Sequence, residues 1–168
     1  MTRKKPSEPS EIIDALRTNL QLLGELAVRY EVSTKPSRRN GHVVTVSSPH
    51  DVHALLRDEM AELAQEQLRV LLLDKRNPLA GQRVIYQGTV SECAIRPAEV
   101  LRPAVVEGMP HLIVAHNHPS GDPTPSPEDI RATRELQRSC KLLGVDLLDH
   151  VVIGGDHFSS IKDLGHID

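Results

Sequence analysis

The sequence predicts one α/β or α+β domain with a mixed central sheet flanked by helices. Two observations lead to this fold class. Amphipathic helical patterns and short apolar or alternating runs follow one another along most of the chain, which is typical of helices packed on a sheet. The chain has 168 residues, which is enough for one compact core with a short appendage but too few for two independent cores.

The first 42 residues are predicted to lie outside this core. Apolar residues recur at three- and four-residue steps over positions 10–30, which is the pattern of an amphipathic helix. Residues 33–41 are polar, basic and rich in turn-forming residues, so we interpret them as a linker. We therefore divide the chain into an N-terminal helix and basic linker, residues 1–42, and a main domain, residues 43–168.

Caps and turn residues separate the elements of the main domain. Ser48 and Ser126, each followed by proline, are typical helix N-caps, and Gly108 and Gly144 are suited to ending helices. The predicted elements are, in order, a strand at 43–46, a helix from Pro49 to about residue 64, a buried strand at 67–74, a turn at 76–78, a strand at 83–90 interrupted at Gly88, a helix at 97–107, a strand at 111–115, a helix from Pro127 closing near Gly144, two short strand segments within 145–153, and a turn at Gly154 and Gly155.

The composition favours a soluble protein of the cytoplasm. The formal net charge is −3, from 20 basic and 23 acidic residues, so attraction to nucleic acid or anionic lipid would need a local patch. The apolar runs are far shorter than a membrane span, and no signal-peptide core follows the basic N-terminus. The two cysteines have no paired spacing, which agrees with a reducing compartment.

Two histidines and an aspartate have the spacing of a metal site. His116 and His118 follow the apolar run 111–115, and because side chains alternate along an extended chain, both imidazoles project to the same side. Prolines stiffen the next loop, which can return Asp129 as a third ligand from the first turn of a helix. Two histidines and one carboxylate leave one position of a tetrahedral Zn²⁺ open, as in catalytic sites that hydrolyse amides.

A structural explanation competes for part of this motif. Ser126 and Asp129 have the spacing of a capping box, in which both side chains satisfy the first backbone groups of a helix. Taken alone, these two residues are better explained by capping, and isolated His-x-His pairs occur at many strand ends. The combination of the two pieces across a proline-rich loop favours the metal site.

The same residues resemble a known family. The spacing of His116, His118, Ser126 and Asp129 is similar to the JAMM motif of the JAB/MPN metalloprotease superfamily. More narrowly, His-Asn-His-Pro-Ser-Gly-Asp at 116–122 and Leu-Asp-His at 148–150 resemble the bacterial RadC family, with similarity from about residue 43 to 165. The resemblance implies the JAB/MPN fold, which is similar to that of cytidine deaminases, with a single zinc ion and a glutamate that acts through the metal-bound water.

The resemblance also suggests which residues perform catalysis. The family's glutamate lies where a helix passes into the first core strand, so Glu66 is the expected general base. From spacing alone, Glu59 and Glu62 are rival candidates, and any of the three could be an ordinary exposed carboxylate. Ser126 carries over as a hydroxyl that donates a hydrogen bond to the developing oxyanion.

Four further polar residues are candidates for supporting roles. Asn117 and Ser120 are expected to shape the pocket. Asp149 or His150 could support a ligand by hydrogen bonding, although a buried polar pair between strands explains them slightly better.

The sequence departs from the family pattern in two places. Pro97-Ala98-Glu99 lacks the arginine of the family's Pro-Arg-Glu segment, which puts any substrate contact by that segment in doubt. Residues 1–42 are too short for the family's helix-hairpin-helix region and lack its paired glycine-bearing turns.

The leading functional hypothesis is a zinc-dependent peptidase or isopeptidase acting on a peptide or protein substrate. The alternative is a DNA-associated RadC-like protein with a role in DNA repair or processing. Because the chain has few aromatic residues and few clustered cations, we expect nucleic-acid binding to be weak or absent. A deaminase is disfavoured because its His-x-Glu and Pro-Cys-x-x-Cys signature is missing, and an inert scaffold is disfavoured by the intact ligand set. The sequence does not indicate the oligomeric state.

Overall fold

The computed structural model describes residues 37–39, 42–88 and 95–168. Thr34–Asp168 form one compact unit. The helix predicted over 10–30 lies outside the described residues, as does most of the predicted linker.

A five-stranded mixed sheet forms the centre of this unit, in the order β4-β3-β5-β6-β7. The strands are β3 (Gln67–Leu73), β4 (Leu79–Gln87), β5 (His111–Asn117), β6 (Asp146–Gly154) and β7 (His157–Ser160). Strands β5 and β6 are parallel, and the other three neighbouring pairs are antiparallel. The predicted fold class, a mixed sheet with flanking helices, is therefore confirmed.

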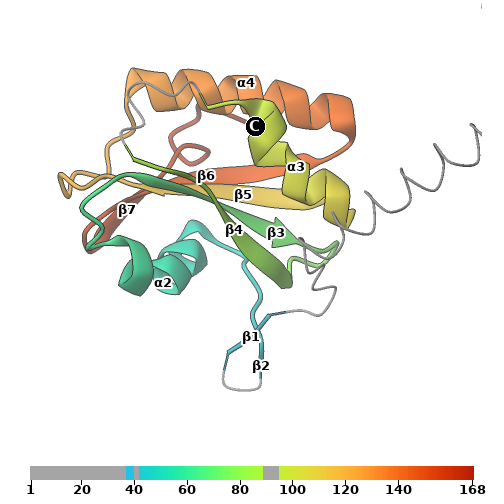
Figure 1. The fold of residues 1–168 in the computed structure, drawn as a ribbon, viewed down its shortest axis with the longest axis horizontal. Helices are drawn as coiled ribbons and strands as arrows, with labels where there is room; N and C mark the ends of the chain where they lie inside the picture. Colours follow the sequence, from blue (N-terminus) through green and yellow to red (C-terminus); the bar gives the residue numbers. More distant parts are fainter. Residues whose placement is uncertain (1–36, 40–41, 89–94) are drawn as a thin grey trace, which may run out of the picture. The chain divides into compact units, whose positions relative to one another are not determined.

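Helices cover both faces of the sheet, so the domain has three layers (Figure 1). Helices α3 (Pro97–Glu107) and α4 (Pro127–Leu143) pack on one face, and α2 (Pro49–Met60) packs on the other. Consecutive residues of β3 enter opposite cores: Leu72 packs with the α3 and α4 side, and Leu71 and Leu73 with the α2 side. Burial on both faces explains why the sequence of β3 is continuously apolar.

The helices begin where the local sequence predicts, and α3 and α4 also end there. Ser48 and Ser126 are N-caps with complete capping boxes, each followed by a proline in the first turn. Gly108 and Gly144 end α3 and α4 in the left-handed conformation, which glycine adopts without a steric penalty. Helix α2 ends at Met60, earlier than predicted, because the chain turns before it enters β3.

Most of the predicted strands are present with different ends, and some strands were not predicted. Strand β4 begins at Leu79, before its alternating pattern starts, because its first residues are buried beside β3. Strand β6 is continuous where two segments were predicted, and the short strand β7 was not predicted. Part of the predicted linker forms a small ribbon, in which β1 (Arg38–Arg39) pairs with β2 (His42–Val43).

No helix among the described residues has both the length and the apolar composition needed to cross a membrane.

The three-layer packing predicts that core truncation is costly. Leu72 is fully buried between β3 and the α3 and α4 layer. Leu72→Ala should lower the free energy of unfolding by about 2–5 kcal/mol, because it removes buried apolar surface and leaves a cavity. Leu142 is 87% exposed, so Leu142→Ala should change stability by no more than about 0.5 kcal/mol. Denaturant unfolding of both variants measures the difference, and similar values for the two would contradict this packing.

Candidate metal centre

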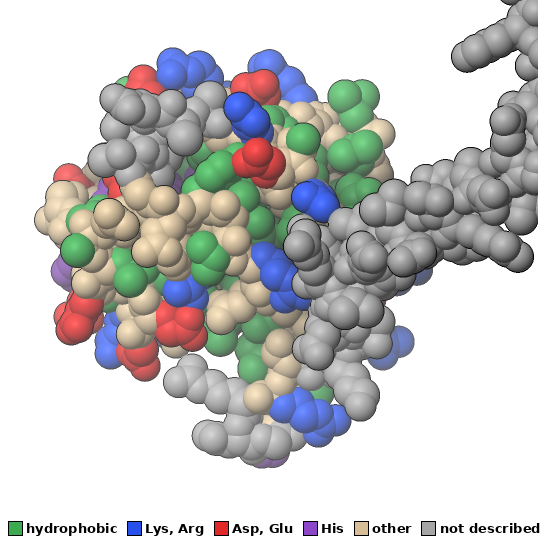
Figure 2. Space-filling view, in the orientation of Figure 1, with side chains coloured by type: hydrophobic (Ala, Val, Ile, Leu, Met, Phe, Trp, Pro, Cys, Tyr) green, Lys and Arg blue, Asp and Glu red, His purple; other side chains and the backbone are tan. Residues whose placement is uncertain are grey.

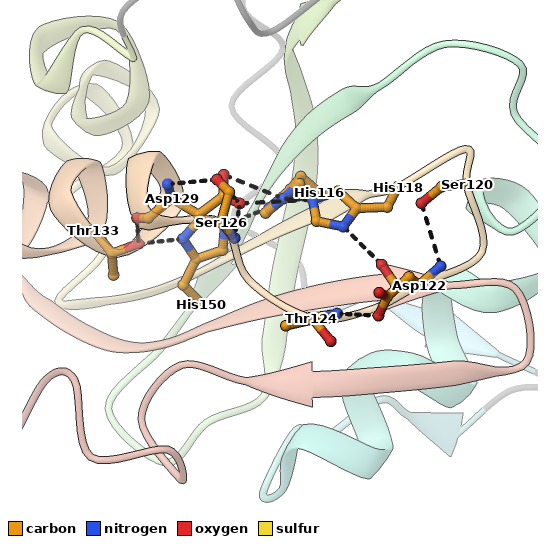
Figure 3. A network of polar contacts seen from close by, with 9 residues as sticks. All are labelled: His116, His118, Ser120, Asp122, Thr124, Ser126, Asp129, Thr133 and His150. Carbon is orange, nitrogen blue, oxygen red and sulfur yellow. Dashed lines mark hydrogen bonds and ion pairs between the residues drawn. The ribbon is translucent and has the colours of Figure 1, made fainter.

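Three segments meet at the carboxyl end of β5. His116 is the penultimate residue of β5, His118 follows the strand, and Asp129 lies in the first turn of α4 (Figure 3). The backbone N–H of His118 donates to the carbonyl of Ile153 in β6, at 2.8 Å. This bond holds the start of the loop against the neighbouring strand.

Asn117 points away from the cluster and joins β5 to the start of β3. Its side-chain oxygen accepts a hydrogen bond from the backbone N–H of Gln67 at 2.8 Å, and its amide nitrogen donates to the carbonyl of Gln65 at 3.2 Å. Asn117 is buried. It therefore acts on the site indirectly, by fixing the segment that carries Glu66.

The loop between His118 and α4 packs directly on Gly154 of β6. A Cβ atom at Gly154 would lie 2.6 Å from the carbonyl oxygen of Gly121 and 2.6 Å from the nitrogen of Pro123. Within the loop, the Asp122 carboxylate accepts from the backbone N–H of Thr124 at 2.9 Å, and the Ser120 hydroxyl accepts from that of Asp122 at 3.3 Å. Close packing and local hydrogen bonds thus position the loop that ends at Asp129.

The donor atoms of the three candidate ligands converge. The Nε2 atoms of His116 and His118 are 3.0 Å apart, and the Asp129 carboxylate oxygens lie 3.4 Å from the first and 3.6 Å from the second. Atoms bound about 2.0–2.1 Å from a tetrahedral zinc ion lie roughly 3.3 Å from one another. The spacing of the three side chains therefore fits one such ion, and no other group of this kind occurs among the described residues.

The ring nitrogens that face away from the cluster have defined partners. His118 Nδ1 lies 2.8 Å from the backbone oxygen of Asp122, which can only accept, so Nδ1 carries a proton. Nε2 presents a lone pair in the neutral ring, and in the doubly protonated ring it would donate to His116 or Asp129. His116 Nδ1 lies 2.8 Å from Nε2 of His150, and His150 Nδ1 lies 2.6 Å from the hydroxyl of Thr133. Both candidate ligands are thus held by a hydrogen bond on their far side, as is usual for metal-binding histidines.

Burial and hydrogen bonding set the charges in the cluster. Burial opposes ionisation of Asp129, but its hydrogen bonds with His116 and His118 hold its pKa well below the ordinary value. The hydrogen bond with Asp129 raises the pKa of His118, against the effect of partial burial. Burial lowers the pKa of His150 well below the ordinary value, so this imidazole is neutral at neutral pH.

Capping and ligand geometry coexist at Ser126 and Asp129. The Asp129 carboxylate accepts hydrogen bonds from the backbone N–H of Ser126 at 2.8 Å and from its hydroxyl at 2.6 Å, and the Ser126 oxygen accepts from the N–H of Asp129 at 3.1 Å. The same carboxylate faces both histidines. The two interpretations of the sequence are therefore compatible, because the cap orients the carboxylate toward the imidazoles.

An open cleft of about 410 Å³ adjoins the cluster. Its lining residues are Glu66, His118, Pro119, Ser120, Ser126, Glu128 and Asp129. Of the three glutamates proposed from spacing, Glu66 lines the cleft, whereas Glu59 pairs with Arg69 and Glu62 is exposed elsewhere. Glu128 was not considered from the sequence; it pairs with Arg131 at 3.3 Å on the exposed surface of α4.

Asp149 and His150 point to opposite faces of β6, as neighbouring strand residues do. The Asp149 carboxylate accepts hydrogen bonds from the Ser160 hydroxyl at 2.6 Å and from the backbone N–H of Lys162 at 3.2 Å. This makes Asp149 a buried structural link to the C-terminal segment, whereas His150 contacts His116. Thr133 is among the residues that resemble the RadC family, but sequence reasoning gave it no role in the site, although its position one helical turn after Asp129 was the available signal.

A mixed sheet with helices on both faces, and a His-x-His strand end facing the first turn of the next helix, defines a JAB/MPN-like domain. A family model described as RadC-like JAB domain matches residues 46–166, and the chain belongs to this family.

Three relatives carry the name UPF0758 protein, which states no activity. A relative from Clostridium botulinum is 38% identical over 86% of this chain and 61% of its own length. One from Clostridium perfringens is 36% identical over 95% of this chain and 68% of its own. One from Methanosarcina mazei is 39% identical over 85% of this chain and 60% of its own. The chain thus spans about three fifths of the length of the Clostridium botulinum and Methanosarcina mazei relatives.

The contact of the loop with Gly154 predicts a sensitive glycine. Gly154→Ala should weaken zinc binding and lower stability by about 1–3 kcal/mol, because the added methyl group meets backbone atoms that cannot move independently. Gly81→Ala is a control outside the cleft, since the nearest atoms to its Cβ would belong to the Arg83 guanidinium and not to backbone. Zinc titration against a competing chelator checks both variants. Equal zinc affinities of the Gly154→Ala and Gly81→Ala variants would show that the loop between His118 and α4 can shift without loss of the site.

Substitutions at Asp129 and Ser126 separate the ligand role from the capping role. Asp129→Asn removes the anionic donor, so zinc affinity and metal-linked stability should fall sharply. Ser126→Ala should keep zinc and cost about 0.5–2 kcal/mol of stability, because it removes a cap but no ligand. Zinc content and melting temperature with and without chelator are the measurements. Full zinc content in both variants would leave capping as the only role of Asp129.

Proposed function

We propose that this chain is a zinc-dependent hydrolase of the JAMM type that cleaves amide bonds as a peptidase or isopeptidase. The observation that carries this proposal is the position of Glu66 in the same cleft as His118, Ser126 and Asp129. A carboxylate, a set of metal-binding donors and an open space for substrate thus occur together.

His116, His118 and Asp129 would hold the ion, whose fit to their spacing is described above. When bound, Zn²⁺ polarises a substrate carbonyl and lowers the pKa of water so that it attacks at neutral pH. The protein would contribute three donor atoms on one side of the ion and leave the side that faces the cleft open.

Glu66 is the proposed general base. It lies at the entry to β3, where Asn117 holds the adjacent backbone, and it is a half-buried residue that lines the cleft. A base in this place would take a proton from the attacking water and return it to the leaving nitrogen. Holding this carboxylate near the reacting atoms reduces the entropy lost in reaching the transition state.

Ser126 is the proposed oxyanion donor, and its geometry adds a condition to that role. Its hydroxyl proton is directed to the Asp129 carboxylate at 2.6 Å. To stabilise an oxyanion, the hydroxyl must turn from Asp129 toward the cleft when the substrate carbonyl gains charge. The backbone N–H of Ser126 still binds Asp129 in that arrangement, so the carboxylate keeps its orientation.

The substrate proposed for this cleft is a peptide or protein segment. The cleft is open and lies at the surface, which suits an extended chain better than a small enclosed ligand. On the face drawn in Figure 2, basic and acidic side chains of the described residues are interspersed, which does not favour a phosphate-binding surface. For this reason we rank the DNA-associated alternative second.

The proposal predicts about one zinc per chain and a separable role for Glu66. Glu66→Gln should keep the metal but abolish hydrolysis, because the glutamate serves the water and not the ion. Glu62→Gln, which alters an exposed carboxylate outside the cleft, is the control and should retain activity. Elemental analysis and a screen over peptide, isopeptide and nucleic-acid substrates provide the measurements. Absence of zinc uptake would refute the metal assignment, and full activity of Glu66→Gln would point to another base.

A further inference from the structure

A chain of hydrogen bonds inside the domain connects two of the candidate ligands. It runs from the ring of His116 in β5 to His150 in β6, then to Thr133 in α4, and ends on the backbone carbonyl of Asp129 (Figure 3). His150 and Thr133 are 1% exposed. Water therefore does not compete for these bonds, and the neighbouring donors and acceptors determine which atom carries each proton.

The direction of this chain follows from counting donors and acceptors. The Thr133 oxygen lies 2.6 Å from the carbonyl oxygen of Asp129, which can only accept, so the single hydroxyl proton is donated there. The hydroxyl must then accept from Nδ1–H of His150, 2.6 Å away. A neutral imidazole with its proton on Nδ1 presents a lone pair at Nε2.

The same counting continues to the metal cluster. Because Nε2 of His150 is an acceptor, the contact of 2.8 Å requires the proton of His116 to be on Nδ1. The Nε2 atom of His116 then presents its lone pair toward His118 and Asp129. A reversal at any point would place a proton on the atom that should bind the metal.

We infer that Thr133 and His150 are positioning residues that set the tautomer of His116, and that the Thr133 hydroxyl determines the direction of the whole chain. This inference rests on the proposed metal site but not on the reaction performed there. The usual partner of a metal-binding histidine is a carboxylate, a carbonyl or water, each of which accepts without ambiguity. A neutral histidine such as His150 can either donate or accept at the nitrogen that faces the ligand. The group bonded to its other nitrogen, here the Thr133 hydroxyl, therefore determines which it does.

The same series of hydrogen bonds also joins Asp129 to His116. Thr133 bonds to the carbonyl of the residue one turn earlier, which is a common geometry for threonine in a helix. Here that residue is Asp129, so one hydroxyl contacts the first turn of α4 and, through His150, acts on the proton position of His116 in β5. Loss of the hydroxyl would leave His150 Nδ1–H without its acceptor in a buried site, which favours the opposite tautomer.

Three substitutions in the full chain test this inference. Thr133→Val removes the hydroxyl while keeping the shape of the side chain, and Thr133→Ser keeps the hydroxyl. Ser139→Ala is the matched control, because the Ser139 hydroxyl makes the same kind of bond to the carbonyl of Glu135, at 3.1 Å on the exposed side of α4. The first measurement is zinc affinity against a competing chelator. The second is heteronuclear NMR of the imidazole nitrogens in metal-free protein at about pH 8, well above the ordinary histidine pKa.

We expect Thr133→Val to weaken zinc binding by about 10- to 100-fold, the range typical for loss of a group that orients a metal ligand. Thr133→Ser should restore wild-type affinity, and Ser139→Ala should not change it. In metal-free wild-type protein both His116 and His150 should carry the proton on Nδ1, and Thr133→Val should shift His116 toward the Nε2–H form.

Two results would overturn the inference. One is an Nε2–H tautomer of His116 in the metal-free wild-type protein. The other is a Thr133→Val variant that keeps the wild-type tautomer and affinity. If the wild-type protein bound no zinc, the proposed function would fail, and the tautomer measurement would still decide the direction of the chain. A fall in melting temperature shared by Thr133→Val and Thr133→Ser, with no change in tautomer, would assign Thr133 a packing role only.

Discussion

Strands β5 and β6 run parallel, so the chain between them must cross over one face of the sheet, and α4 makes that crossing. The crossover starts beside His116 and ends with the strand that carries His150. It therefore brings the first turn of α4 back to the end of β5, where Asp129 meets the two histidines. The same path places Thr133 against His150. The candidate metal centre thus depends on one topological constraint, which positions β5, α4 and β6 together.

The crossing loop has little freedom because it is held at both ends. At its start, the N–H of His118 is bonded to β6, and its middle lies against the bare backbone of Gly154. At its end, the capping box of α4 orients the carboxylate of Asp129. Proline supplies stiffness between these points. The protein can therefore hold three polar side chains close together, although their lone pairs and charge repel one another unless a cation lies among them.

The candidate site has two sides, an open side at the cleft and a closed side where buried hydrogen bonds reach the candidate ligands. On the open side, Glu66 and Ser126 face the space where a substrate would lie. On the closed side, His150 and Thr133 are almost completely buried, and they contact the candidate ligands only through hydrogen bonds behind the cluster. This division is typical of metal sites, in which groups away from the substrate hydrogen-bond to the ligands and fix their orientation.

The sequence by itself determined the class of fold, the helix starts, the glycine-capped ends of α3 and α4, and the grouping of His116, His118 and Asp129. It could do so because caps, glycine and side-chain alternation act over a few residues. Spacing alone could not choose among the three candidate glutamates, of which the family resemblance favoured Glu66. The sequence also could not show that Asp149 and His150 have different surroundings. Those distinctions depend on which strands pair and which face each side chain enters, so residues far apart in the chain decide them. The tertiary structure alone placed Glu66 in the cleft, Thr133 beside His150 and Gly154 beneath the loop.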